Sequence, residues 1–211
     1  LADISFVAAL PGVARAEVVA GRAEMILAAA TERDMGARVL ALAAMVPIVP
    51  PDNPLPQIST GDLARVLSGE VANWAEIGGP DMPLVLHGLV ADAALQRALA
   101  ARLGREVAAS VLHDDISALG VAVQRDPWAV AMTVRAGVAG ARVLPLTDSC
   151  GFPLLPSALA VKAEDYPLAL PIYLLTLQRR MPLFVREFLT FLDTPQAQAV
   201  VAAAGWVDRQ P

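Results

Sequence analysis

His87 is the titratable side chain best placed to contact a ligand. It follows the apolar run Leu84–Leu86, which predicts a strand, and it precedes a segment that predicts a helix. The N-terminus of a helix carries partial positive charge and unbonded N–H groups, and a protonated imidazole beside it would add to that charge. His87, Gly88 and Leu89 are therefore candidates for contact with a small anion. The alternative is a hydrogen-bonded surface histidine without a ligand.

A second group of polar side chains follows an earlier predicted strand, Glu24–Ala28. After this alanine-rich stretch, polar residues return with Thr31 and Arg33. A hydroxyl and a guanidinium group both donate hydrogen bonds to anions, so these two residues are candidates for ligand binding. The alternative for Arg33 is an exposed loop position. Asp92 is interpreted as the N-cap of the next helix, because its carboxylate would satisfy the first N–H groups and repel an anion.

The remaining reactive residues predict neither a catalytic site nor a metal site. His113–Asp115 resembles part of a metal site, but no second His or Cys lies at ligand spacing. The chain has no G-x-S-x-G motif and no P-loop, and Gly137–Gly140 lacks the spacing of a dinucleotide-binding turn. The single cysteine, Cys150, cannot form a disulfide within the chain. We therefore expect a binding protein, with no enzymatic activity, no cofactor and no metal.

Composition and charge narrow the class of protein further. Of the 211 residues, 56% are hydrophobic and 18% are charged, which excludes intrinsic disorder because so much apolar surface can be buried. The formal net charge of -5 argues against a nucleic-acid partner, which would require clustered cations. Prolines interrupt each long apolar stretch before the roughly 20 residues that a membrane-spanning helix needs. We therefore expect no membrane span.

Strand and helix patterns alternate along the chain, which predicts an α/β architecture. Strands are expected at 4–7, 24–28, 39–49, 84–86, 128–134 and 142–146. Helices are expected from Pro11, from Ser59, from Asp92, from Asp114 or Asp115, over 182–192 with Phe184, Phe188 and Phe191 as its apolar face, and from Thr194. Ser59 with Asp62, and Asn73 with Glu76, have the spacing of helix caps reinforced by a carboxylate.

Six segments along the chain form a series that can be compared with known families. They are Ala20–Glu24, Val46–Pro54, Ile58–Gly79, Cys150–Phe152, Lys162–Leu168 and Gln198–Asp208. The most specific is the run from Ser68 to Gly79, which contains Ser-Gly-Glu, then Asn-Trp, then Gly-Gly. In this order the segments resemble the phosphate-binding proteins of ABC importers (PstS-like). The resemblance is closest to those proteins in which such a domain precedes an OmpA-like, peptidoglycan-binding domain.

The resemblance implies an α/β, two-lobed, type II periplasmic-binding-protein-like fold with two hinge crossings. It also implies that the chain lacks the N-terminal strand–helix unit of that family. Residues 1–47 and 156–211 would form lobe I, and residues 48–155 would form lobe II. The crossings would lie near Val46–Pro51 and Pro153–Ala160. Trp74 and Tyr166 lie in resembling segments and are interpreted as packing and hinge residues.

The chemistry expected from the resemblance is incomplete in this sequence. Proteins of this family hold phosphate with backbone N–H groups and hydroxyls at helix N-termini, together with an Arg and an Asp. The first Gly/Ser-rich loop has no counterpart here, and the loop after Ala28 is alanine-rich. In the second lobe, His87–Asp92 stands where an Arg or Asp followed by Ser-Gly-Thr is expected. An underbonded dianion in a desolvated site is unfavourable, so we expect a degenerate oxyanion site that does not bind phosphate tightly.

The resemblance therefore implies a periplasmic solute-binding domain that takes a small anionic solute and works with ABC importer membrane subunits. The alternative is a non-transport interaction scaffold of a cell-envelope, OmpA-like protein, which has no small ligand and is anchored by a neighbouring domain at the cell wall. The effector-sensing half of a transcription regulator shares the fold and is a third alternative. It would need an N-terminal DNA-binding helix pair, which these residues do not show.

Overall fold

The chain forms two compact units. The computed structural model describes residues 4–90, 93–177 and 181–208. Unit 1 comprises Leu1–Ala43 and Leu170–Pro211, and unit 2 comprises Ala44–Ala169. Two strands, β2 (Met35–Val49) and β10 (Ala169–Leu177), run from one unit into the other. The predicted lobes assigned residues 44–47 and 156–169 to lobe I, whereas both segments belong to unit 2 here.

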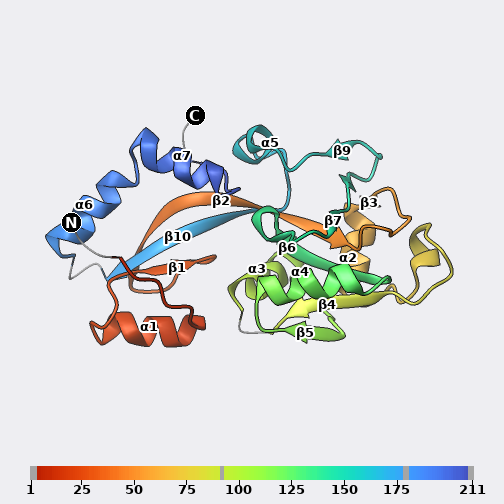
Figure 1. The fold of residues 1–211 in the computed structure, drawn as a ribbon, viewed down its shortest axis with the longest axis horizontal. Helices are drawn as coiled ribbons and strands as arrows, with labels where there is room; N and C mark the ends of the chain where they lie inside the picture. Colours follow the sequence, from red (N-terminus) through yellow and green to blue (C-terminus); the bar gives the residue numbers. More distant parts are fainter. Residues whose placement is uncertain (1–3, 91–92, 178–180, 209–211) are drawn as a thin grey trace. The chain divides into compact units, whose positions relative to one another are not determined.

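Unit 1 is a small sheet covered by a helix on each face. Its elements are α1 (Pro11–Val19), β1 (Ile26–Ala28), the first part of β2, most of β10, α6 (Leu183–Phe191) and α7 (Pro195–Ala203). β1 pairs antiparallel with β10, which lies next to β2. Neighbouring residues of a strand point to opposite faces. Leu175 packs with Val18 of α1, and Leu174 packs with Val185 and Leu189 of α6, so the two helices lie on opposite sides of β10 (Figure 1).

The first predicted strand is absent from unit 1. Residues 4–10 have no regular structure, and the side chains of Phe6 and Val7 are 81% and 87% exposed. No described strand pairs with this segment, and strand propensity without a pairing partner does not produce a strand. The predicted helix that follows is confirmed, with Pro11 in its first turn.

The apolar face of α6 differs from the prediction. The helix was expected to bury Phe184, Phe188 and Phe191. It buries Val185 and Leu189 instead, while Phe184 and Phe191 remain about half exposed. Val185 and Leu189 are four residues apart and form one stripe on the helix, which packs against β10.

Unit 2 is built on a sheet in the order β2, β6, β4, β5. β6 (Ala129–Val134) pairs antiparallel with β2, and β4 (Val85–Leu89) and β5 (Val111–His113) follow in parallel. The helix α4 (Ile116–Arg125) packs against all three of these strands, and α3 (Ala94–Leu103) packs against β4. The alternation of strands and helices confirms the predicted α/β class.

The other elements of unit 2 are short. They are β3 (Ile58–Ser59), α2 (Thr60–Leu67), the 3-10 helices η1 (Trp74–Ile77) and η2 (Arg135–Gly137), β7 (Arg142–Val143), β8 (Leu146–Thr147), β9 (Pro153–Leu154) and α5 (Ala158–Lys162). β3, β8 and β9 form a second, three-stranded sheet.

None of the helices in the described parts of either unit has the length and apolar character needed to cross a membrane.

The predicted helix caps are present in unit 2. The Ser59 hydroxyl accepts a hydrogen bond from the Asp62 N–H at 3.0 Å and donates one to the Asp62 carboxylate at 2.8 Å. The Asn73 side chain caps η1, and the Glu76 carboxylate accepts from the Asn73 N–H at 3.0 Å. Asp115 caps α4 by accepting from the Ala118 N–H. The predicted cap Asp92 lies outside the described residues.

Trp74 and Tyr166 are buried and hydrogen-bonded, as expected of packing residues, and the hinge role stays a prediction. Trp74 is fully buried, and its indole N–H donates to the Trp128 carbonyl at 3.0 Å. The buried Tyr166 hydroxyl donates to the Met45 carbonyl at 2.7 Å. Burial raises the pKa of Tyr166, so its hydroxyl stays protonated as a donor, although Arg135 opposes this shift. This bond joins the segment before β10 to β2 within unit 2.

Candidate functional site

The parallel strands of unit 2 bring both histidines of the chain together. His87 lies in β4, and His113 ends the neighbouring strand β5. Asp126 follows the last residue of α4, shortly before β6, and β6 pairs with β4 on its other side. Three side chains that are far apart in the sequence therefore meet, and we call them the His87 cluster: His87, His113 and Asp126.

Both ring nitrogens of His87 already have partners. The residue is only 5% exposed, with Nε2 lying 3.1 Å from Asp126 Oδ2 and Nδ1 lying 3.0 Å from Nε2 of His113. Because an ionised carboxylate only accepts, His87 Nε2 carries a proton, and in the neutral ring Nδ1 accepts from His113. The two rings are stacked, with centroids 5.2 Å apart. His87 is therefore a bonded core residue, neither the predicted surface histidine nor a donor left over for an anion.

The electrostatics of the cluster favour an uncharged His113. Burial lowers the pKa of His113, and repulsion by a protonated His87 lowers it further, while Asp114 and Asp115 act in the opposite direction. Asp126 is held in place by a second bond, because its Oδ1 accepts from the Trp128 N–H at 2.9 Å. The cluster thus holds one carboxylate against a pair of imidazoles, and with His113 uncharged it has no surplus positive charge for an anion.

Gly88 packs against Ala109, in the segment before β5, rather than opening space for a ligand. A Cβ atom on Gly88 would lie 2.6 Å from the Cβ of Ala109 and 3.5 Å from the amide of Gln96. Real Cβ atoms do not approach so closely, so the glycine is required by this contact. Gly88 remains a candidate for ligand contact through its backbone alone.

Leu89 is the last residue of β4, and its apolar side chain is buried. Its N–H donates to the Gln96 side-chain oxygen at 3.4 Å, a long hydrogen bond from strand β4 to helix α3. Ala93 precedes α3 and provides no side-chain cap. Among the described residues of this loop, therefore, no hydroxyl or guanidinium group is available for an oxyanion.

Thr31 and Arg33 lie in unit 1, between β1 and β2, and both are exposed. The neighbouring Glu32 forms an ion pair with Arg15 at 3.0 Å, and Arg15 also donates to the Arg33 carbonyl at 3.2 Å. The loop is therefore tied to α1 through its backbone and Glu32. Of the five predicted ligand residues, three are consecutive in β4 of unit 2, and the other two, Thr31 and Arg33, belong to unit 1. A joint role with Thr31 and Arg33 stays a prediction.

The sequence analysis missed His113 and Asp126, which are bonded to His87, and Gln96, which accepts from the Leu89 N–H. His113 was considered only as part of a metal site, and in the described parts of the chain no group of three or more ligand residues could hold a metal. One signal in the sequence could have indicated that the two histidines are close, because each follows a short apolar run that precedes a helix. Such runs predict parallel strands, and the ends of parallel strands meet at one edge of a sheet.

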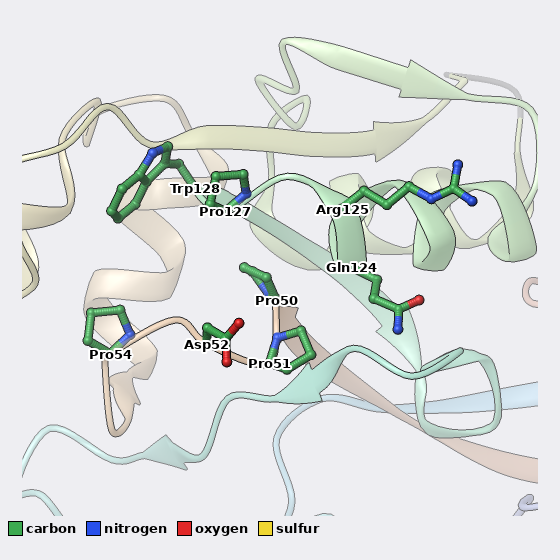
Figure 2. Close-up of a pocket in the computed structure, with 8 residues that line it drawn as sticks. All are labelled: Pro50, Pro51, Asp52, Pro54, Gln124, Arg125, Pro127 and Trp128. Atoms are coloured by element: carbon green, nitrogen blue, oxygen red, sulfur yellow. The ribbon is translucent and has the colours of Figure 1, made fainter.

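A separate pocket of about 220 Å³ lies in unit 2, near the end of α4. It is lined by Pro50, Pro51, Asp52, Pro54, Gln124, Arg125, Pro127 and Trp128. Figure 2 shows the prolines and the Trp128 ring around the hollow, while the Arg125 side chain points away from Pro50 and Pro51. The Asp52 carboxylate lies among the prolines. This apolar pocket with an acidic group does not suit an oxyanion.

Comparison with solved structures identifies the fold. An ABC-type phosphate transport receptor from Vibrio cholerae is similar, with a TM-score of 0.75 and 16% identity over 95% of this chain and 85% of that chain. A putative phosphate ABC transporter substrate-binding protein from Clostridium perfringens, with bound phosphate, has a TM-score of 0.82 and 16% identity over 92% and 83%. A high-affinity periplasmic phosphate-binding protein, PfluDING, bound with phosphate, has a TM-score of 0.73 and 12% identity over 88% and 75%.

The sequence matches no protein-family model and no curated protein. At identities this low the structural similarity concerns the fold, which is that of the phosphate-binding proteins of ABC transporters. The predicted fold class is confirmed.

Proposed function

We propose that this chain is a periplasmic solute-binding domain, related to the substrate-binding proteins of phosphate ABC transporters, with a degenerate oxyanion site. The solved structures that it resembles are described as a transport receptor and as phosphate-binding proteins, so we propose binding without catalysis. In transport, its partners would be the membrane subunits of an ABC importer, and the ligand would be a small anionic solute other than phosphate.

One observation carries the degenerate part of the proposal: both ring nitrogens of the buried His87 are already bonded. Phosphate needs several donors at once, because a buried dianion without partners is strongly unfavourable. Gly88 and Leu89 add no polar side chain. The remaining donors are backbone N–H groups near the start of α3, together with Thr31 and Arg33 if these contribute. Such a set favours weak binding of a singly charged anion.

The same observation favours a second function. A loop whose polar groups are bonded within the protein suits a scaffold that holds no solute. In that case the chain would be an interaction module of a cell-envelope protein, next to an OmpA-like domain that binds peptidoglycan.

Thermal unfolding with added anions tests the proposal. A site with a Kd of 10 μM would stabilise the protein by about 2.7 kcal/mol in about 1 mM inorganic phosphate, which is a clear rise in Tm. We expect no rise with phosphate or sulfate and a small rise with at least one monovalent carboxylate or phosphonate. The rise with that anion should shrink in Arg33→Gln and persist in Arg65→Gln, an exposed arginine of unit 2 that pairs with Asp62.

A phosphate-dependent rise of that size would contradict the degenerate site. No rise with any anion would contradict solute binding and favour the scaffold. The scaffold would then be tested by co-sedimentation of the full-length protein with peptidoglycan.

A further inference from the structure

A second pocket, with polar groups in its lining, is located in unit 1, on the α6 side of its sheet. The alternation of strand residues determines which side chains face it. Leu175 packs on the α1 side of β10, so the next residue, Thr176, faces α6. On β2, Leu40 packs on the α6 side, so Arg38 and Gly36, which lie two and four residues earlier, face the same way.

The cavity between these strands and the helix has a volume of about 320 Å³. Its lining includes Gly36, Arg38, Leu174, Thr176, Arg186 and Leu189, and we call it the α6 pocket. The volume is at the lower end of the range for small-molecule sites, which begins at about 300 Å³. None of its lining residues is acidic, and two are arginines. The pocket is therefore cationic, with apolar walls.

Two donors of the α6 pocket have no partner in the described parts of the chain. Thr176 is only 5% exposed, yet its hydroxyl forms no hydrogen bond with any described residue. The Arg186 guanidinium forms no ion pair with a described carboxylate. Arg38, by contrast, pairs with Asp193. A hydroxyl without a protein partner at the pocket wall is available to donate a hydrogen bond to a ligand acceptor.

We propose that the α6 pocket binds a small organic anion, a carboxylate with a short apolar group. Arg186 and Thr176 hold the carboxylate, and Leu174 and Leu189 contact the apolar group. The planar guanidinium group matches a carboxylate with two parallel hydrogen bonds. Both leucines belong to the apolar cluster beneath α6, so the ligand's apolar part extends an existing contact.

The inference concerns unit 1 alone and does not depend on the proposed solute-binding function. None of the five residues proposed for solute contact lines this pocket. Inorganic phosphate suits it poorly, because a dianion has no apolar part and the leucine walls offer it no donors.

Benzoate and butyrate are the probes for this site, and binding is measured by isothermal titration calorimetry. Benzyl alcohol is the uncharged control of similar shape. We expect benzoate to bind at least about tenfold more tightly than benzyl alcohol, because only the carboxylate makes a charge-assisted bond. Arg186→Gln should weaken benzoate binding at least about tenfold, and Thr176→Val about fivefold.

Arg22→Gln is the matched control, since Arg22 is an exposed arginine of unit 1 that pairs with Glu17 at 2.7 Å. Benzoate binding should be unchanged in this variant. Urea unfolding of each variant establishes that it is folded. Equal benzoate affinity in wild type and Arg186→Gln would overturn the proposal. So would the absence of benzoate and butyrate binding at about 10 mM, or binding of inorganic phosphate as tight as that of benzoate.

Discussion

The His87 cluster of unit 2 and the α6 pocket of unit 1 differ in whether their polar groups are already bonded. In unit 2, the ring nitrogens of His87 are bonded to Asp126 and His113 inside the core. In unit 1, the Arg186 guanidinium and the Thr176 hydroxyl line a cavity without described partners. A residue type that can bind anions therefore predicts a ligand site only where its neighbours leave the donor available. The two sites therefore differ in what their polar groups do: the bonded groups of the His87 cluster stabilise the fold, and the unbonded groups of the α6 pocket are available to a ligand.

His87→Ala should give the largest loss of stability. The substitution leaves a cavity and removes the hydrogen-bond partner of both Asp126 and His113, so we expect the free energy of unfolding to fall by about 3 kcal/mol. Urea denaturation measures this change. Arg186→Gln serves as the comparison in unit 1 and should change stability by less than about 0.5 kcal/mol. If the two substitutions had equal effects, the contrast between the bonded cluster and the open pocket would be wrong.

Gly88→Ala should lower the free energy of unfolding by about 2 kcal/mol, because the added methyl group overlaps Ala109. The double variant Gly88→Ala with Ala109→Gly removes the overlap and should recover most of the loss. Gly12→Ala is the control, since nothing lies within 4 Å of a Cβ there and alanine favours the helix α1. It should leave stability equal or slightly higher. A tolerated Gly88→Ala would mean that this glycine is kept for another reason, such as backbone contact with a solute.

The sequence predicted local features of unit 2 well. Ser59 and Asn73 were recognised as helix caps, and Asp115 was one of two alternatives, because a cap depends on side chains within three residues of it. Trp74 was recognised as a packing residue from its place in a resembling segment. These predictions required no knowledge of distant contacts.

The candidate sites were harder to predict because they depend on distant contacts. His87 was identified, but its partners come from β5 and the end of α4, and only the register of the parallel strands brings them to it. In α6, the three phenylalanines predicted the wrong buried face. With Val185 and Leu189 against the sheet, the helix instead presents Arg186 to the pocket. Periodicity alone could not decide between two apolar stripes on one helix.

Acid should weaken the fold through His113. Burial and a protonated His87 lower the pKa of His113 from its ordinary value of 6.5. The unfolded chain then takes up this proton at a higher pH than the folded protein, so stability is complete above pH 6.5 and is lost as pH falls toward the folded pKa. We expect the urea midpoint of the wild type to decrease between about pH 7 and about pH 5.5. His113→Gln should flatten this slope, and an unchanged slope would place the titrating group elsewhere.

Thr176→Val should have the smallest effect on stability and the clearest meaning. Valine has the shape of threonine, and a hydroxyl without a partner contributes no hydrogen bond, so the free energy of unfolding should change by less than about 0.5 kcal/mol. Thr133→Val is its counterpart in unit 2, where the hydroxyl is fully buried and has no partner, and there we expect a gain of about 1 kcal/mol. Urea denaturation measures both. A loss of more than about 1 kcal/mol in Thr176→Val would show that its hydroxyl is bonded within the protein, and the α6 pocket would then resemble the His87 cluster rather than contrast with it.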